Sequence, residues 1–178
     1  MAGGAAVLAA TAAAASLAHT GSGVAHVMVS PAKLGSYVQE PSLARDMGAA
    51  ALQKQIVASS SGEAKHVVYA VYEDATGRAA RHGPQIILFI GGNRSGTSAS
   101  SFMSSFAGKL AGAATTSPGS MGGAAACVPS VAGRLAECAW ADDDTFGVVA
   151  SPTLSAAALA SELRTVRPLV EKRTSRPG

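Results

Sequence analysis

Two strand-forming segments joined by a polar link constrain the fold of this chain most strongly. Residues 65–74 (KHVVYAVYED) and 85–92 (QIILFIGG) are rich in β-branched and aromatic side chains. The link between them is polar and contains glycine and proline, which predicts a hairpin. Both faces of the first segment are apolar, as is typical of a strand that other elements cover on both sides of its sheet.

Further periodic segments lie on both sides of this hairpin. A helix is predicted over residues 42–59, with Ser42 as N-cap after Pro41, and a second over residues 98–110, with Ser98 as N-cap. Four short strands are predicted after it, over residues 113–116, 124–128, 135–141 and 146–150.

The closing helix carries the clearest signals. Ser155 is its predicted N-cap, and Leu154 and Leu159 occupy the two positions of a hydrophobic staple. Pro168 is expected to kink or end the helix. Its predicted apolar face consists of Leu159, Leu163, Val166 and Val170.

The order of these elements favours an α+β fold in which helices cover an antiparallel β-sheet, because the strands come in consecutive runs with short links. We expect one globular domain over residues 27–172. An alanine-rich segment, residues 1–26, precedes it, and a disordered tail, residues 173–178, is expected to follow.

The first eighteen residues contain no charged side chain and are the expected targeting segment. A signal peptide would offer cleavage after Ala18 or Ala25, but no positively charged residue precedes the apolar stretch. A membrane span would have about this length, although alanine is only weakly apolar. Signal peptide, membrane anchor and low-complexity tail all remain open, as does a translation start further upstream.

Charge and motifs argue against several functions. The 178 residues carry a net charge of +3 with scattered basic side chains, whereas nucleic-acid binding needs a dense basic stripe with interleaved aromatics. Residues 91–98 (GGNRSGTS) are similar to a phosphate-binding loop, but Thr97 stands where its lysine should be. Arg94 and the nearby amides would hold an anion only weakly.

No complete catalytic, cofactor or metal motif is present in the sequence, so none of these groups is predicted. The histidines are interpreted as ordinary surface or half-buried side chains rather than as bases or ligands. They are His19, His26, His66 and His82.

Cys127 and Cys138 are candidates for a disulfide, for half of a metal site, or for two buried thiols. They stand at mirror positions about Ala132 and Gly133, so in a hairpin they would face each other across adjacent strands. A zinc site would need further ligands at short spacing, which are absent from the sequence. With an exported start the disulfide is the prediction, and it implies an oxidising compartment.

Three consecutive carboxylates, Asp142, Asp143 and Asp144, follow Cys138 and Trp140. Strand alternation places Cys138 and Trp140 on one face, with Trp140 as a core anchor. The aspartates lie where the chain must reverse, and aspartate is favoured there because its carboxylate accepts from nearby amides. A calcium loop would alternate its ligands and then place a glycine. We interpret this acidic loop as a turn, with a metal or acid/base site as the alternative.

Four stretches give a resemblance to a known family: KLGSYV, HVVYAVYED, QIILFIGG and CAWADDDTFGVVASPTLSAAALASELRTVRPLVE. They are similar to an uncharacterised group of exported or single-span membrane proteins of high-GC Gram-positive bacteria. The extracytoplasmic domain of that group ends in Cys-x-Trp-x-Asp, Thr-Phe-Gly, Ser-Pro-Thr and an amphipathic helix. The resemblance covers residues 33–172 and implies an N-terminal span or signal, but no activity. Element order alone also resembles PsbP and mycobacterial LpqN, which is fold analogy without functional content.

Three functions compete at this point. The leading hypothesis is a non-catalytic extracytoplasmic domain, secreted or membrane-anchored, that is a binding or accessory module of a cell-envelope protein. Its expected partner is an envelope protein or a lipid, with a membrane tether through the N-terminal segment and no nucleic acid. The first alternative is an envelope hydrolase that uses Asp142, Asp143 and Asp144. The second is a structural piece whose alanine-rich N-terminal helix packs in the bilayer.

Overall fold

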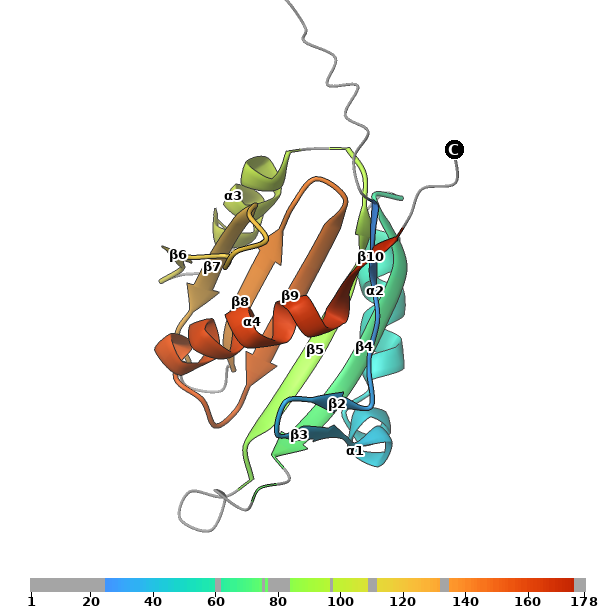
Figure 1. The fold of residues 1–178 in the computed structure, drawn as a ribbon, viewed down its shortest axis with the longest axis vertical. Coiled ribbons are helices and arrows are strands. Elements are labelled where there is room, and N and C mark those ends of the chain that lie inside the picture. Colours follow the sequence, from blue (N-terminus) through green and yellow to red (C-terminus); the bar gives the residue numbers. More distant parts are fainter. Residues whose placement is uncertain are drawn as a thin grey trace, which may run out of the picture.

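One antiparallel sheet of eight strands forms the centre of the molecule, and helices lie on both of its faces (Figure 1). The structure is a computed structural model that describes residues 25–59, 62–74, 76, 84–96, 98–108, 112–131 and 135–174. The predicted fold class, α+β with an antiparallel sheet covered by helices, is confirmed. In sheet order, the strands are β2 (Lys33–Leu34), β3 (Tyr37–Gln39), β4 (Ala64–Asp74), β5 (Ile86–Arg94), β9 (Thr145–Ser151), β8 (Ala136–Ala141), β7 (Ala124–Val128) and β6 (Ala114–Thr116).

The predicted hairpin is formed by β4 and β5, which pair over most of their length. β5 also pairs with β9, so these two strands occupy the middle of the sheet. The ladder between β4 and β5 is interrupted between Lys65 and Val68, where His66 has a φ of +48°. The four short strands predicted further along the chain are present as β6 to β9.

Helix α4 (Ala156–Val170) covers one face of the sheet, which we call the front face. Its predicted apolar face is buried, and the Oγ of Ser155 accepts a hydrogen bond from the backbone N of Ala158, as expected for an N-cap. Beneath the helix, the rings of Phe89 and Trp140 stack at a centroid distance of 6.2 Å. Pro168 lies inside the last turn, and α4 continues past it to Val170.

Three helices lie on the opposite, back face: α1 (Pro41–Asp46) and α2 (Ala49–Ser59) contact β4, and α3 (Ala99–Gly108) contacts β7 and β8. The single helix predicted over residues 42–59 is therefore wrong, because the chain forms two helices. Gly48 adopts a φ of +66° between them, a left-handed conformation that ends α1 and that glycine tolerates. The predicted N-cap Ser42 also lies inside α1, whose N-cap is Glu40.

Residues at both ends of the described part of the chain form strands, which the sequence did not predict. Strand β1 (Ala25–Met28) pairs with β10 (Glu171–Thr174) in a two-stranded antiparallel ribbon. Arg173 and Thr174, expected in a disordered tail, thus have strand partners, and so does His26 in the expected N-terminal segment. Their polar composition conceals this pairing, because the partner strand lies at the other end of the chain. The expectations for residues 1–24, 132–134 and 175–178 concern residues outside the described ranges.

Within the part of the chain that the structure describes, none of the helices has the length and apolar character that a membrane span requires.

Candidate functional site

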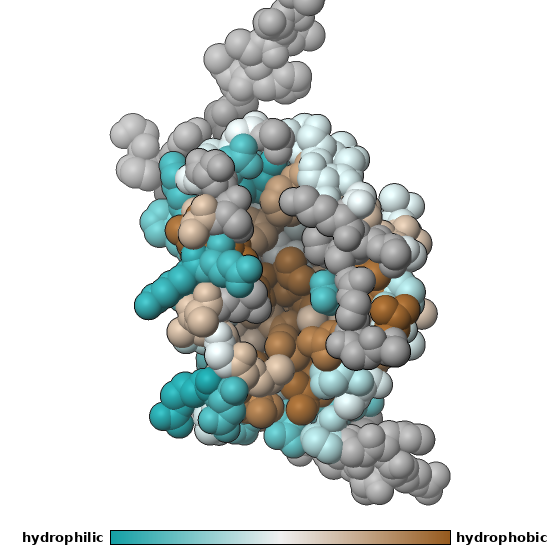
Figure 2. All heavy atoms as spheres, turned by 180° about the vertical axis from the view of Figure 1, so that it is seen from behind, coloured by the Kyte–Doolittle hydropathy of each residue, from teal (hydrophilic) through white to brown (hydrophobic). Residues whose placement is uncertain are grey.

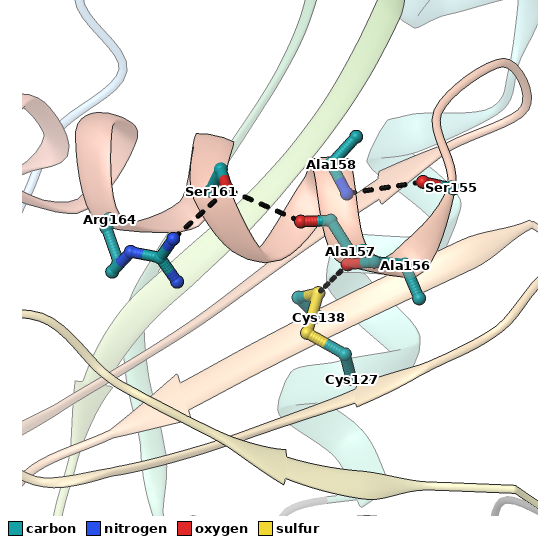
Figure 3. Close-up of a disulfide and its surroundings, with 8 residues drawn as sticks. All are labelled: Cys127, Cys138, Ser155, Ala156, Ala157, Ala158, Ser161 and Arg164. Carbon is teal, nitrogen blue, oxygen red and sulfur yellow. Dashed lines mark hydrogen bonds between the residues drawn. A yellow bond between two sulfur atoms is a disulfide. The ribbon is translucent and has the colours of Figure 1, made fainter.

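A disulfide joins Cys127 of β7 to Cys138 of β8, as predicted. The two residues stand directly opposite each other in the antiparallel pair, with their Cα atoms 4.0 Å apart. The bond lies beneath the first turn of α4, where Sγ of Cys138 is 3.8 Å from the carbonyl oxygen of Ala156 (Figure 3). Cys138 and Trp140 share the front face, also as predicted. A buried disulfide of this kind is typical of proteins that fold in an oxidising compartment.

The acidic loop forms the turn between β8 and β9, and Asp142 holds that turn closed. Its Oδ1 accepts hydrogen bonds from the backbone N of Asp144 at 3.2 Å and from the backbone N and Oγ1 of Thr145 at 2.8 and 2.9 Å. This is the local bonding for which aspartate is favoured in turns. Asp143 is exposed to solvent. The loop is thus a turn whose first carboxylate is committed to the backbone on one oxygen.

The other oxygen of Asp142 binds Arg167, a fully buried arginine of α4. Nη2 of Arg167 lies 2.7 Å from Oδ2 of Asp142. Nη1 donates to the carbonyl oxygens of Gly122 at 2.6 Å and Pro118 at 3.2 Å, in the segment that leads into β7. Nε donates to Oε2 of Glu171 at 2.8 Å. Every nitrogen of the guanidinium group therefore has an acceptor inside the protein.

Glu171, the first residue of β10, completes this buried ion network. Its Oε2 accepts from Nε1 of Trp140 at 3.2 Å as well as from Nε of Arg167. The side chain of Glu171 is 0% exposed and that of Arg167 is 1% exposed, whereas that of Asp142 is 14% exposed. The network links the β8–β9 turn, α4 and β10.

His26 of β1 joins the network at its solvent side. Its backbone N donates to Oδ2 of Asp144 at 2.7 Å, and its Nδ1 lies 3.1 Å from Oδ1 of the same residue. Nδ1 of His26 is also 3.9 Å from Oε1 of Glu171. Nδ2 of Asn93 on β5 donates to the carbonyl oxygen of His26 at 2.6 Å. These contacts attach β1 to the middle of the sheet.

The protein environment shifts the pKa values of Asp142 and Glu171 in opposite directions. Burial would raise the pKa of Asp142, but hydrogen bonds with Glu171, Thr145 and the backbone of Asp144 outweigh burial and lower its pKa to about 2. For Glu171, burial raises the pKa, and the nearby Asp142 carboxylate adds to the rise while Arg167 opposes it. The pKa of Glu171 is therefore above that of Asp142, so Glu171 takes up a proton at a higher pH than Asp142 does.

Geometry alone would allow His26, Asp142 and Glu171 to contact one metal ion, because one ligand atom from each lies within 4.8 Å of the others. The guanidinium of Arg167 contacts both carboxylates, however, and supplies the positive charge that a metal would otherwise bring. The arrangement fits an internal ion network better than a metal centre.

Arg94, in the segment that resembles a phosphate-binding loop, also contacts other parts of the protein. Nη1 of Arg94 donates to the carbonyl oxygen of Asp142 at 2.6 Å, and its guanidinium carbon lies 5.2 Å from the centre of the Phe102 ring. Thr97 lies outside the described residues. Arg94 thus helps to position the acidic turn.

The sequence singles out Asp142 but not the other three residues of the ion network, which are His26, Arg167 and Glu171. His26 lies in the predicted N-terminal segment and Glu171 near the end of the predicted domain. Arg167 lies in a small cluster of basic residues near the C-terminus. One signal was available for Arg167: it stands four residues after Leu163 and three before Val170, on the apolar face of the helix. A charged residue on a buried face needs a partner. Nothing local indicates His26, because its contacts depend on the pairing of β1 with β10.

No protein-family model, curated protein or solved structure matches this chain. The resemblance to exported proteins of high-GC Gram-positive bacteria stays a prediction.

Proposed function

We propose that this chain is a non-catalytic extracytoplasmic domain that acts as a binding or accessory module of a cell-envelope protein. The observation that carries the proposal is the enclosure of the buried ion network. Arg167 lies between Asp142 and Glu171 and contacts both, and internal donors already use their oxygens.

A catalytic carboxylate must reach its substrate, and these carboxylates face the protein interior. The side chain of Glu171 is 0% exposed, and Oδ1 of Asp142 is bonded to its own turn. Such a network holds a turn, a helix and a terminal strand together. We assign it a structural role and place the function elsewhere on the surface.

The disulfide supports an exported location, because such bonds persist in oxidising compartments. The uncharged N-terminal segment supports export or tethering, and the domain would then be secreted or membrane-anchored. An envelope protein or a lipid is the partner class that suits this location.

The test is retention of envelope material by the purified, disulfide-bonded domain. The immobilised domain is mixed with separated lipid and protein fractions of a Gram-positive envelope, and the same domain after reduction, alkylation and unfolding is the control. We expect the folded domain alone to retain a defined lipid or protein. A folded domain that retains neither would contradict the proposal.

A second candidate, an envelope hydrolase, is favoured by one observation. Asp142 and Glu171 have pKa values pushed in opposite directions, a pattern that acid/base sites also show, and His26 is close to both. Divalent-metal uptake and hydrolysis of cell-wall and ester substrates are measured on wild-type protein, Asp142→Asn and Asp143→Asn. Turnover that Asp142→Asn abolishes would support the hydrolase, and a wild-type protein without turnover would eliminate it.

A further inference from the structure

The helix layer on the back face covers the middle of the sheet only in part. α2 packs on β4, and α3 packs on β7 and β8, with β5 and β9 between them. The strand under α2 and the midpoint of the two strands under α3 are thus about three and a half strand spacings apart, or roughly 17 Å at about 4.8 Å per spacing. Figure 2 shows this face hollowed between its raised sides, with apolar side chains in the hollow. We call this hollow the back groove.

The floor of the back groove is aliphatic. Side chains that alternate along β5 and β9 point to this face and are only partly buried, while their neighbours Phe89 and Val149 on the front face are fully buried. The floor residues are Ile86, Leu88 and Ile90 of β5 and Val148 and Ala150 of β9.

One end of the back groove is closed. Phe146 of β9 lies beside Phe102 of α3, with ring centroids 5.7 Å apart, and only 4% of Phe146 is exposed. Met103 of α3 and Val67 of β4 are buried in the same cluster, and Ile56 of α2 packs against it. The two sides of the groove therefore meet at this end.

The other end carries negative charge. Glu73 of β4 pairs with Ile86, and Glu137 of β8 pairs with Ala150, so both glutamates share the face of the floor. Both are half-buried. Among the ion pairs of the described residues, none involves either glutamate.

We propose that the back groove binds the single alkyl chain of an amphiphile whose head group is positively charged. The aliphatic floor would cover the chain, and the closed end would receive its terminal methyl group. Glu73 and Glu137 lie on opposite sides of the open end, three strand spacings apart, and would attract the positive head group to that end. The five floor residues have no hydrogen-bonding side chain, and Tyr69 of β4 stands beside Ile90 on the same face. Such a surface offers little to a polar peptide but suits a hydrocarbon. This inference rests on the proposed binding function and names the site and the ligand class.

The experiment is a calorimetric titration of the full chain with dodecyltrimethylammonium below its micelle concentration, with dodecanoate as the anionic counterpart. We expect saturable one-to-one binding of the ammonium compound and at least about tenfold weaker binding of dodecanoate. Leu88→Asn introduces a polar group on the floor, and Ala150→Phe fills the groove with an apolar group. Each is expected to weaken binding at least about tenfold.

Three controls keep the result interpretable. Ala158→Asn, on the exposed front of α4, should bind as wild type does. Glu73→Gln combined with Glu137→Gln should bring the ammonium compound and dodecanoate to similar affinity. Circular dichroism and thermal unfolding identify any variant that fails to fold. If one of the two floor variants does not fold, the other one tests the groove.

The inference would be overturned if the wild-type protein showed no saturable binding or preferred dodecanoate. It would also be overturned if both floor variants bound the ammonium compound as tightly as wild type does. If wild type still retains an envelope component, and folded floor variants retain it equally, only the back groove inference fails. A wild-type domain that retains no envelope component contradicts the proposed function itself, whatever the titration shows.

Discussion

Arg167 binds Asp142 and Glu171 at the same time, with Nη2 2.7 Å from Oδ2 of Asp142 and Nε 2.8 Å from Oε2 of Glu171. The guanidinium is buried beneath the β8–β9 turn, and it joins α4 to that turn and to β10. Burial of such charged groups costs desolvation free energy, and removal of one partner leaves the others buried without their counter-charge. The stability of the fold should therefore depend strongly on each member of this network.

Arg167→Met should lower the free energy of unfolding by about 3 to 5 kcal/mol, because it leaves two buried carboxyl groups without their counter-charge. Arg164→Met, one turn earlier on the exposed side of α4, is the matched control and should change stability by less than about 0.5 kcal/mol. Urea unfolding followed by circular dichroism measures both. If the two substitutions lowered the free energy of unfolding equally, the buried Arg167 would stabilise the fold no more than the exposed Arg164 does.

The pH dependence of stability should carry the signature of Asp142. Its pKa is about 2 in the folded protein, below its value in the unfolded chain. Its stabilising contribution is thus complete above about pH 4 and is lost as the pH falls toward 2. Glu171 acts in the opposite sense: its raised pKa stabilises the fold at low pH, and this contribution is lost as the pH rises through its folded-state pKa.

Urea unfolding of wild type and Asp142→Asn at a series of pH values tests the contribution of Asp142. The wild-type protein should lose more stability than the variant between about pH 4 and 2, because the variant lacks the titrating carboxylate. Parallel curves for the two proteins would contradict the assignment of the low pKa to Asp142.

Gly147 of β9 lies directly beneath the indole ring of Trp140, and a Cβ atom at this position would overlap that ring. Because both residues are in the fully packed front core, Gly147→Ala should destabilise the fold by about 1 to 3 kcal/mol. Gly108→Ala, at the end of α3 where a Cβ would meet open space, should be neutral or slightly stabilising. Thermal unfolding compares them, and similar melting temperatures would argue against the tight packing of Trp140.

Loss of the disulfide should cost about 3 kcal/mol, because the bond closes a short loop, with a sequence separation of 11, in the unfolded chain. The measurement is urea unfolding of wild type with and without reductant, beside a double Cys127→Ala, Cys138→Ala variant that should not respond to reductant. If reduction left wild-type stability unchanged, the bond would not brace β7 and β8 as described.

Features that depend on local periodicity were predictable from the sequence. The hairpin of β4 and β5, the facing of Cys127 and Cys138, and the placement of Trp140 follow from strand alternation and turn positions. The capped start of α4 follows from its cap and staple pattern.

Features that depend on distant pairing were not predictable. The ribbon of β1 and β10 joins the two ends of the described chain, and no local signal in the sequence indicates that these two strands pair. Because His26 and Glu171 reach the acidic turn only through this ribbon, the buried ion network could not be assembled from sequence spacing. The break at Gly48 was missed because the residues on both sides of it continue the helical pattern.

The structural role of the acidic turn is tested most directly by urea unfolding of Asp142→Asn beside Asp143→Asn. We expect Asp142→Asn to lower the free energy of unfolding by about 3 kcal/mol, because it removes one of the two carboxylates that pair with the buried Arg167. Asp143 is exposed, and its replacement should change stability by less than about 0.5 kcal/mol. An Asp142→Asn protein as stable as wild type, or more stable, is what replacement of a strained catalytic group would give, and it would contradict the account.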